Sequence, residues 1–260
     1  MLSSVHNVVA VLRAFRLDRP VLSLAEITRT VNLPKATVNK SVQTLLAAGF
    51  LERVDGQPLY RPSLRMFELG HFILRHLDMV REATPFVRHL AEVTGHTAHL
   101  TAYENGEVIW LLRVDSRDQH PLYSRVGRRG PAGATAAGKA ILAFLEPDEL
   151  QHVLAQGWRK LTLKTNADRT VLLRALDEVR RTGYSFQTEE VDIGIASVGA
   201  PIFDYQQRPV ASVSVAGPTE ALTPDAVRRI GRLAQQTALA ISERIGYHAV
   251  RRSRPPGSQK

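Results

Sequence analysis

The chain has 260 residues, of which 44% are hydrophobic and 23% are charged, values typical of a folded protein with one or two domains. It contains no cysteine, which excludes disulfides, thiolate nucleophiles, zinc fingers and iron–sulfur clusters. No stretch approaches the roughly 18 apolar residues that a membrane span needs, and the first twenty residues lack the pattern of a signal peptide. We therefore expect a cytoplasmic protein with no membrane partner, no metal and no cofactor.

Positive charge is concentrated at the two ends of the chain. Residues 1–65 hold 9 basic and 4 acidic side chains, a net charge of +5, whereas residues 66–249 are neutral. Residues 251–260 carry four basic side chains and no acidic one, and are expected to be a basic disordered tail. Clustered Lys and Arg favour binding to a phosphate backbone, but excess charge also serves solubility. Charge alone therefore leaves both interpretations open.

Three helices are predicted within the first fifty residues. Apolar residues at spacings of three and four predict an amphipathic helix over residues 3–19. Ser23 and Glu26 predict a capping box at the start of a short second helix. Pro34 is expected in the first turn of a third helix, which ends before Gly49. The short turn between the second and third helices is typical of a helix-turn-helix unit.

The face of the third helix opposite its apolar side is small, polar or basic, which suits the major groove of DNA. Two strand patterns around Asp55 and Gly56 then predict a β-hairpin, or wing. The residues expected to contact DNA are Lys35, Ala36, Thr37, Asn39, Lys40 and Gln43 on the helix and Arg53 and Arg61 on the wing. The same arrangement of three helices and a hairpin is also compatible with a small interaction domain that does not bind DNA. The local charge of +5 favours double-stranded DNA as the partner.

Apolar residues continue beyond the hairpin, and residues 63–78 are predicted to form a linker helix. Its apolar stripe includes Phe67 and Leu74, which add more apolar surface than so small a head is expected to bury. Association of two copies is the natural way to bury such a stripe. We therefore expect a homodimer or a dimer of dimers.

Helix and strand patterns interleave over residues 79–250 and predict a mixed α/β domain. Helices are expected over 79–94, 136–145, 171–181 and 224–245, and strands over 97–103, 108–114, 196–203 and 209–216. Thr223 is expected to cap the last helix. The predicted fold class is α+β, with a winged helix-turn-helix head over 1–62, the linker helix and this C-terminal domain.

Residues 133–140 nearly match the phosphate-loop pattern GxxxxGK[ST] of nucleotide-binding proteins. Ala140 replaces the Ser or Thr that would bind Mg²⁺, and the preceding residues form a Gly- and Arg-rich loop rather than a buried strand. Nucleotide hydrolysis is therefore weakly supported. Thr135 instead predicts the cap of a helix whose free N–H groups bind an anion, with Arg128 and Arg129 just upstream. A small carboxylate is the expected ligand.

Enzymatic activity is poorly supported elsewhere in the chain. The sequence has neither an HExxH nor a GxSxG motif. His96 and His99 would point to opposite faces of a strand. The adjacent Glu189 and Glu190 are typical of a solvated loop. We therefore expect a protein that is not an enzyme and has no catalytic residues.

Four segments occur in a characteristic order: LSLAEITRTVNLPKATVNKSVQTLLAAGFLE, GRRGPAGATAAGKAILAFL, GYSFQTEEVDIGIASVGAPIFD and SVSVAGP. Together they resemble the IclR family of bacterial transcription regulators. The resemblance implies a recognition helix over 35–47, a GAF-like effector-binding domain that binds a small organic acid, and dimers or dimers of dimers on operator DNA. It also implies an effector site, which, with the capping Thr135, comprises Leu122, Gly130, Ala136, Ala137, Gln187, Ile195, Ser197 and Ser214.

The sequence departs from the family pattern at positions that matter for specificity. Ala36, Asn39 and Lys40 stand where the family often has Ser, an aromatic residue or His, and Arg, so the operator cannot be taken from a relative. Gly133 replaces a frequent His, and Ser197 occupies a position that is Cys or Ser. The effector therefore stays open. Two alternatives also stay open: a ligand-independent architectural DNA-binding protein and, with less support, a nucleotide-using enzyme.

Overall fold

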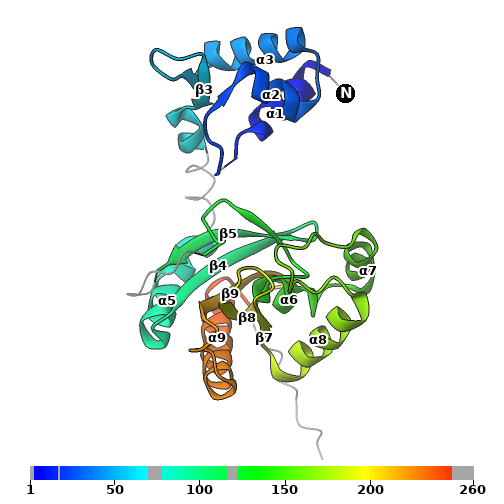
Figure 1. Cartoon of the computed structure of the whole chain (residues 1–260). Coiled ribbons are helices and arrows are strands. Elements are labelled where there is room, and N and C mark those ends of the chain that lie inside the picture. Colours follow the sequence, from blue (N-terminus) through cyan, green and yellow to red (C-terminus); the bar gives the residue numbers. More distant parts are fainter. Residues whose placement is uncertain (1–2, 17, 70–77, 116–121, 248–260) are drawn as a thin grey trace, which may run out of the picture. The chain divides into compact units, whose positions relative to one another are not determined.

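The computed structural model describes residues 3–16, 18–69, 78–115 and 122–247 of the chain. It divides the chain into two compact units, residues 1–77 and 78–260, which are described separately (Figure 1). Residues 64–69, in the predicted linker helix, are helical. The rest of that helix up to residue 77, Leu74 included, and the predicted tail at 251–260 lie outside the described residues.

The first unit packs α1 (Ser3–Ala14), α2 (Leu24–Val31) and α3 (Lys35–Ala47) against a small antiparallel sheet. The sheet has the order β1-β3-β2, with β1 (Leu22–Ser23), β2 (Leu51–Arg53) and β3 (Leu59–Pro62). Val38, Val42 and Leu45 of α3 are buried in the shared core. The unit is therefore a helix-turn-helix followed by a hairpin wing, as predicted.

Local signals account for most of the boundaries in this unit. The Ser23 side chain accepts a hydrogen bond from the Glu26 backbone, while the Glu26 carboxylate accepts one from the Ser23 backbone, so the predicted capping box is present. The predicted length of the first helix is wrong, because α1 ends at Ala14. Arg16 and Arg19 instead exchange two backbone hydrogen bonds in a tight turn. Pro34 precedes α3 rather than starting it.

The second unit contains an antiparallel sheet in the order β6-β5-β4-β9-β8-β7. The strands are β4 (Thr97–Glu104), β5 (Glu107–Val114), β6 (Arg129–Pro131), β7 (Ser185–Thr188), β8 (Ile195–Phe203) and β9 (Pro209–Pro218). The helices are α5 (Asp78–Thr94), α6 (Ala136–Leu142), α7 (Pro147–Gln156), α8 (Arg169–Thr182) and α9 (Pro224–Arg244). The predicted helices and strands are all present, whereas β1, β6, β7 and α7 were not predicted.

The two faces of this sheet carry different side chains, because successive residues of a strand point to opposite faces. On one face, alternate residues such as Leu100, Val198 and Val213 form an apolar core with α5 and α9. Figure 1 shows these two helices next to each other beneath the curved strands. The other face carries small and polar residues such as Ser212 and Ser214, and α6 packs against it. A Cβ atom at Gly199 would lie 2.9 Å from the backbone of Ala136, so glycine permits this close approach.

Candidate functional site

The exposed face of α3 carries the helix residues predicted to contact DNA. They are Lys35, Ala36, Thr37, Asn39, Lys40 and Gln43, of which Thr37 is half-buried and the others are exposed. The helix therefore presents amide, hydroxyl and ammonium groups on a surface separate from its apolar side. Such groups read base edges and bind phosphates in a major groove.

The two wing arginines differ in their surroundings. Arg61 donates to the Glu52 carboxylate at 2.6 Å, which offsets part of its positive charge. The Arg53 guanidinium lies 5.7 Å from the centre of the Tyr60 ring and makes no ion pair with any described residue. Arg53 is therefore the better placed of the two to contact a phosphate.

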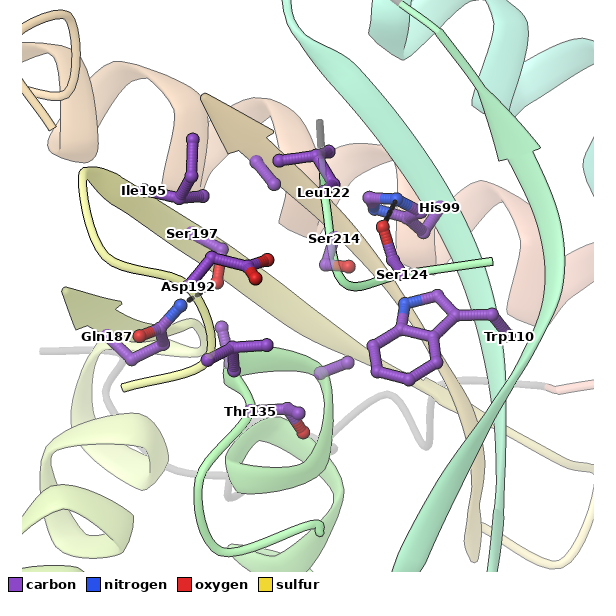
Figure 2. A pocket seen from close by; sticks show the side chains of 14 residues that line it. His99, Trp110, Leu122, Ser124, Thr135, Gln187, Asp192, Ile195, Ser197 and Ser214 are labelled. Carbon is purple, nitrogen blue, oxygen red and sulfur yellow. Dashed lines mark hydrogen bonds between the residues drawn. The ribbon is translucent and has the colours of Figure 1, made fainter. Parts of the chain in front are cut away.

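A pocket lies on the polar face of the six-stranded sheet, next to the start of α6 and the loop between β7 and β8 (Figure 2). Its empty space, including the mouth, is about 390 Å³. Eight predicted effector residues line the pocket: Leu122, Thr135, Ala136, Ala137, Gln187, Ile195, Ser197 and Ser214.

Gly130 is the one predicted effector position that does not line the pocket. It lies on β6 behind Trp110, and a Cβ atom there would come within 2.7 Å of the indole ring. Its lack of a side chain therefore makes room for Trp110. The pocket also includes His99, Trp110, Ser124 and Asp192, none of which was predicted as a site residue.

Two buried hydrogen-bond donors face the pocket without a protein partner. Trp110 and Ser214 are each only 4% exposed, and within the described residues neither the indole N–H nor the Ser214 hydroxyl makes a hydrogen bond. Figure 2 shows the Trp110 nitrogen turned toward the side where Ser124 and His99 lie. Neither atom is fully enclosed, because Thr219 Oγ1 is the one fully buried side-chain atom without a hydrogen bond among the described residues. Both donors therefore border the open space of the pocket, where acceptor atoms of a bound molecule could pair with them.

Gln187 and Ser197 form a fixed polar pair beside these donors. The Gln187 amide nitrogen donates to the Ser197 hydroxyl oxygen at 2.7 Å, and its carbonyl oxygen accepts from the Glu190 backbone at 2.8 Å. Both ends of the Gln187 amide are therefore used by the protein. The hydrogen of the Ser197 hydroxyl stays available to a ligand.

His99 is neutral in the folded protein. Its side chain is buried, and burial, together with the nearby Arg113, lowers its pKa to about 3. The imidazole Nε2 lies 2.8 Å from the Ser124 hydroxyl and hydrogen-bonds to it. His99 therefore supplies no positive charge to the pocket at neutral pH.

Asp192 is the one charged side chain among the described residues that line the pocket. Its Oδ2 accepts a hydrogen bond from the Tyr123 backbone at 2.6 Å. Burial raises the pKa of the carboxyl group, while the Tyr123 hydrogen bond and the charges of Arg128 and Arg113 partly oppose this rise.

The start of α6 is built as predicted, but the upstream arginines do not line the pocket. The Thr135 hydroxyl caps α6 by accepting from the Gly138 backbone at 2.9 Å. Arg128 stacks on the Tyr123 ring, with 3.4 Å between the guanidinium carbon and the ring centre. Arg129 pairs with acidic residues of β4 and β5 instead. The anion-binding potential of this end therefore rests on backbone N–H groups and hydroxyls.

The interpretation of Glu189 and Glu190 as a solvated pair is wrong for Glu190. This residue is 9% exposed, and its carboxylate pairs with the ammonium group of the buried Lys139. The pair joins α6 to the loop that carries Asp192. Lys139 therefore has a structural partner and is not free to bind the phosphates of a nucleotide.

The described ranges offer neither a membrane-spanning helix nor a metal site. No described helix is both long and apolar enough to cross a bilayer. Across the same ranges, no group of three or more His, Asp or Glu side chains is placed to hold a metal ion.

A winged helix-turn-helix unit followed by an α/β unit with a small pocket defines a class of proteins, the effector-responsive transcription regulators. The family model for the IclR helix-turn-helix domain matches residues 4–55, and the model for the bacterial transcriptional regulator IclR C-terminal domain matches residues 71–243. The chain belongs to the IclR family. It is a transcription regulator with a DNA-binding domain and a C-terminal effector-binding domain.

Individual relatives agree with this assignment over almost the whole chain. The HTH-type transcriptional regulator KdgR of Escherichia coli K12 is 31% identical, over 95% of this chain and 94% of that protein. An IclR transcriptional regulator from Silicibacter sp. TM1040 is 28% identical with a TM-score of 0.83, covering 94% and 97% of the two chains. An IclR homologue from Microbacterium hydrocarbonoxydans in complex with 4-hydroxybenzoate shares the fold, with 24% identity, a TM-score of 0.80, and coverage of 93% and 98%.

Proposed function

We propose that a small organic acid binds in the pocket and that its binding changes the affinity of the protein for operator DNA. The buried N–H of Trp110 and O–H of Ser214, which face the pocket unpaired, carry the proposal. A carboxylate supplies the acceptor atoms that these donors lack. The Microbacterium homologue, crystallised with 4-hydroxybenzoate, binds a molecule of this class.

Different parts of the pocket would bind different parts of such a ligand. The backbone N–H groups at the start of α6, at Ala136 and Ala137, would join the two side-chain donors around the carboxylate. Leu122 and Ile195 would cover its apolar part. The ligand changes DNA binding only if it prefers one arrangement of the protein over another. A typical coupling of about 1–3 kcal/mol corresponds to a change of about 5- to 150-fold in DNA affinity.

A calorimetric screen of aliphatic and aromatic acids tests the pocket. Ala136→Asp places a negative charge at the start of α6, and we expect it to abolish binding of any acid that the wild type binds. Gln206→Asp, in the exposed turn between β8 and β9, adds the same charge away from the pocket and should leave binding unchanged. Equal affinities for wild type and Ala136→Asp would overturn the pocket assignment. A wild type that binds no acid would favour the ligand-independent DNA-binding protein.

For the DNA-binding unit, we propose that two copies of α3 enter successive major grooves, with half-site centres about 34 Å apart or a multiple of that distance. Lys40→Ala and Gln43→Ala should relax the sequence preference in a selection from random duplexes. Arg53→Ala should weaken binding to all sequences alike and reduce the salt dependence. Equal losses on selected and random DNA for all three variants would contradict these roles.

For the assembly, we propose a dimer, or a dimer of dimers, formed through the apolar stripe of the linker helix. Phe67 is 66% exposed in the single chain, as expected for a side chain that a second copy covers. Replacing Phe67 and Leu74 by Glu should give a folded monomer in sedimentation experiments. A double variant that still sediments as a dimer would place the interface elsewhere.

We also propose that the protein is not an enzyme and works in the bacterial cytoplasm, where its operator DNA lies. Lys139, the lysine of the phosphate-loop-like segment, is paired with Glu190, and Ala140 has no hydroxyl for Mg²⁺. An ATPase assay with Mg²⁺ should show no turnover. Hydrolysis of ATP above the background rate would instead support a nucleotide-using enzyme.

A further inference from the structure

Two described contacts hold the end of α9, from which the last thirteen residues of the chain continue. Arg244 donates from Nε to Oε2 of Glu82 at 2.9 Å, and a terminal nitrogen of the same guanidinium lies 2.8 Å from that oxygen. The ring of Tyr247, the last residue that the structure describes, has its centre 5.8 Å from that of the Phe203 ring. These contacts fix the point at which residues 248–260 leave the second unit.

The connection to the DNA-binding unit joins the second unit at a neighbouring point. Glu82, the partner of Arg244, lies near the start of α5. Asp78 is the first residue of α5, and the residues before it belong to the unit that carries the winged helix-turn-helix. The start of residues 248–260 is therefore tied to the same helix end that receives the predicted linker.

The tail, residues 251–260, combines four cationic side chains with no anionic one. Its sequence is RRSRPPGSQK, in which the cations are Arg251, Arg252, Arg254 and Lys260. Apart from two prolines it has no apolar side chain, so it has little apolar surface to bury against a protein partner. Guanidinium groups bind phosphate through paired, charge-assisted hydrogen bonds. This composition favours a phosphate-rich polyanion as the partner of the tail.

We propose that the tail is a second DNA-binding segment, whose cationic side chains contact the phosphate backbone of the duplex that α3 reads. The proposal extends the DNA binding of the winged helix-turn-helix unit and is independent of the ligand in the pocket. Once α3 holds an operator, a segment tethered beside the linker is confined near the same duplex. Contacts that are too weak to act alone then still raise the affinity, because the second binding event is intramolecular.

Acidic side chains of the second unit are the alternative partner for the tail. Glu82 already has arginine partners, and Asp204, directly after β8, pairs with Arg208 at 3.1 Å. Glu243 and the acidic residues at 146–149 are exposed and make no ion pair with a described residue. Duplex DNA offers one negative charge per about 1.7 Å of its axis, a far denser array than these scattered carboxylates. A tail held by them would be withheld from DNA, so the two cases predict opposite effects of removing its charge.

Fluorescence anisotropy on the full-length protein at several salt concentrations tests the proposal. The probes are a labelled duplex that the protein selects from a random pool and a random duplex of the same length. Replacing Arg251, Arg252 and Arg254 by Gln should weaken binding to both duplexes by the same factor, because phosphates carry no sequence information. The loss should be about 10-fold or more at about 50 mM salt, and the slope of log affinity against log salt should fall by about 0.9 for each lost phosphate contact, up to about 2.7 per chain.

Two further variants separate the tail from charge in general. Replacing the same three arginines by Lys keeps the charge and should keep the salt slope. The matched control replaces Arg174, Arg229 and Arg232 by Gln, since these residues are exposed on α8 and α9 and make no ion pair with a described residue. Arg232 precedes Arg244 by twelve residues of α9, roughly 18 Å at 1.5 Å per residue, which exceeds the Debye length of about 10 Å at 0.1 M salt. The control should leave both the affinity and the slope unchanged.

Each other outcome overturns the proposal in a recognisable way. An unchanged salt slope in the Gln variant of the tail would show that the tail does not contact phosphates. Tighter DNA binding by this variant would mean that acidic side chains of the chain hold the tail. Equal losses in the tail variant and the control would assign the effect to net charge. In these cases wild type still binds its duplex, whereas a wild type that binds no duplex would remove the DNA-binding function together with the proposal.

Discussion

The buried His99 makes the stability of the second unit depend on pH. Replacing His99 should therefore weaken this pH dependence. The pKa of His99 is lowered from an ordinary 6.5 to about 3 by burial. Between these values the unfolded chain binds a proton that the folded chain does not. The contribution of His99 to stability is therefore complete above pH 6.5 and is lost as the pH falls toward 3.

The size of the effect follows from the linkage between protonation and folding. Each pH unit in this window costs about 1.4 kcal/mol for one proton. Lowering the pH from 6.5 to 4.5 should therefore remove about 2 kcal/mol of unfolding free energy in wild type through His99 alone. His99→Gln keeps a polar group near Ser124 but has no such proton. Between pH 6.5 and 4.5, the unfolding free energy of this variant should therefore fall by about 2 kcal/mol less than that of wild type.

Urea unfolding at pH 6.5, 5.5 and 4.5 measures this difference. Both tryptophans, Trp110 and Trp158, lie in the second unit, so their fluorescence reports the unfolding of that unit. His152→Gln removes an exposed histidine of α7 and controls for the loss of a histidine as such. Parallel pH profiles for wild type and His99→Gln would refute the account of a buried neutral imidazole.

Three further variants test the packing and the donors around the pocket. Lys139→Met leaves the buried Glu190 carboxylate without its cation, with the Asn166 backbone N–H as a remaining donor, and should destabilise the second unit by about 3 kcal/mol. Adding Glu190→Leu should restore most of the loss in urea unfolding. Gly138→Ala would place a Cβ atom 2.2 Å from the backbone of Ala132. The melting temperature should therefore fall, with a loss of about 1–3 kcal/mol of unfolding free energy. An unchanged melting temperature would contradict the close contact. Trp110→Phe replaces the indole by a smaller aromatic ring without an N–H, and acid affinity in calorimetry should fall about 10-fold or more. Unchanged affinity would show that the indole does not bind the carboxylate.

The elements of the first unit could be predicted because their signals are local. The capping box of Ser23 and Glu26 and the apolar spacing of α3 are each contained within a few residues. The end of α1 could not be predicted in this way. The apolar spacing continues to Phe15, but a turn closed by Arg16 and Arg19 ends the helix first.

The pocket was only partly predictable, because its walls come from segments far apart in the chain. The family resemblance supplied seven lining positions and also Gly130, which lies behind Trp110, whereas Thr135 was predicted as a helix cap. His99 and Asp192 were missed because their neighbours become visible only after the strands pair. His99 lies directly across from Ser214 in the register of β4 and β9. The alternation of residues along β4 does place His99 on the polar face of the sheet. It does not indicate that α6 and the β7–β8 loop cover this face.

Control of DNA binding by an acid in the pocket can be measured as the coupling between the two binding events. The measurement is the fluorescence anisotropy of a labelled duplex, selected by the protein from a random pool, titrated with and without a saturating amount of the acid that binds most tightly. We predict a change of about 5- to 150-fold in DNA affinity, matched by an equal change in acid affinity when DNA is bound. Binding of the acid with no change in DNA affinity would contradict it.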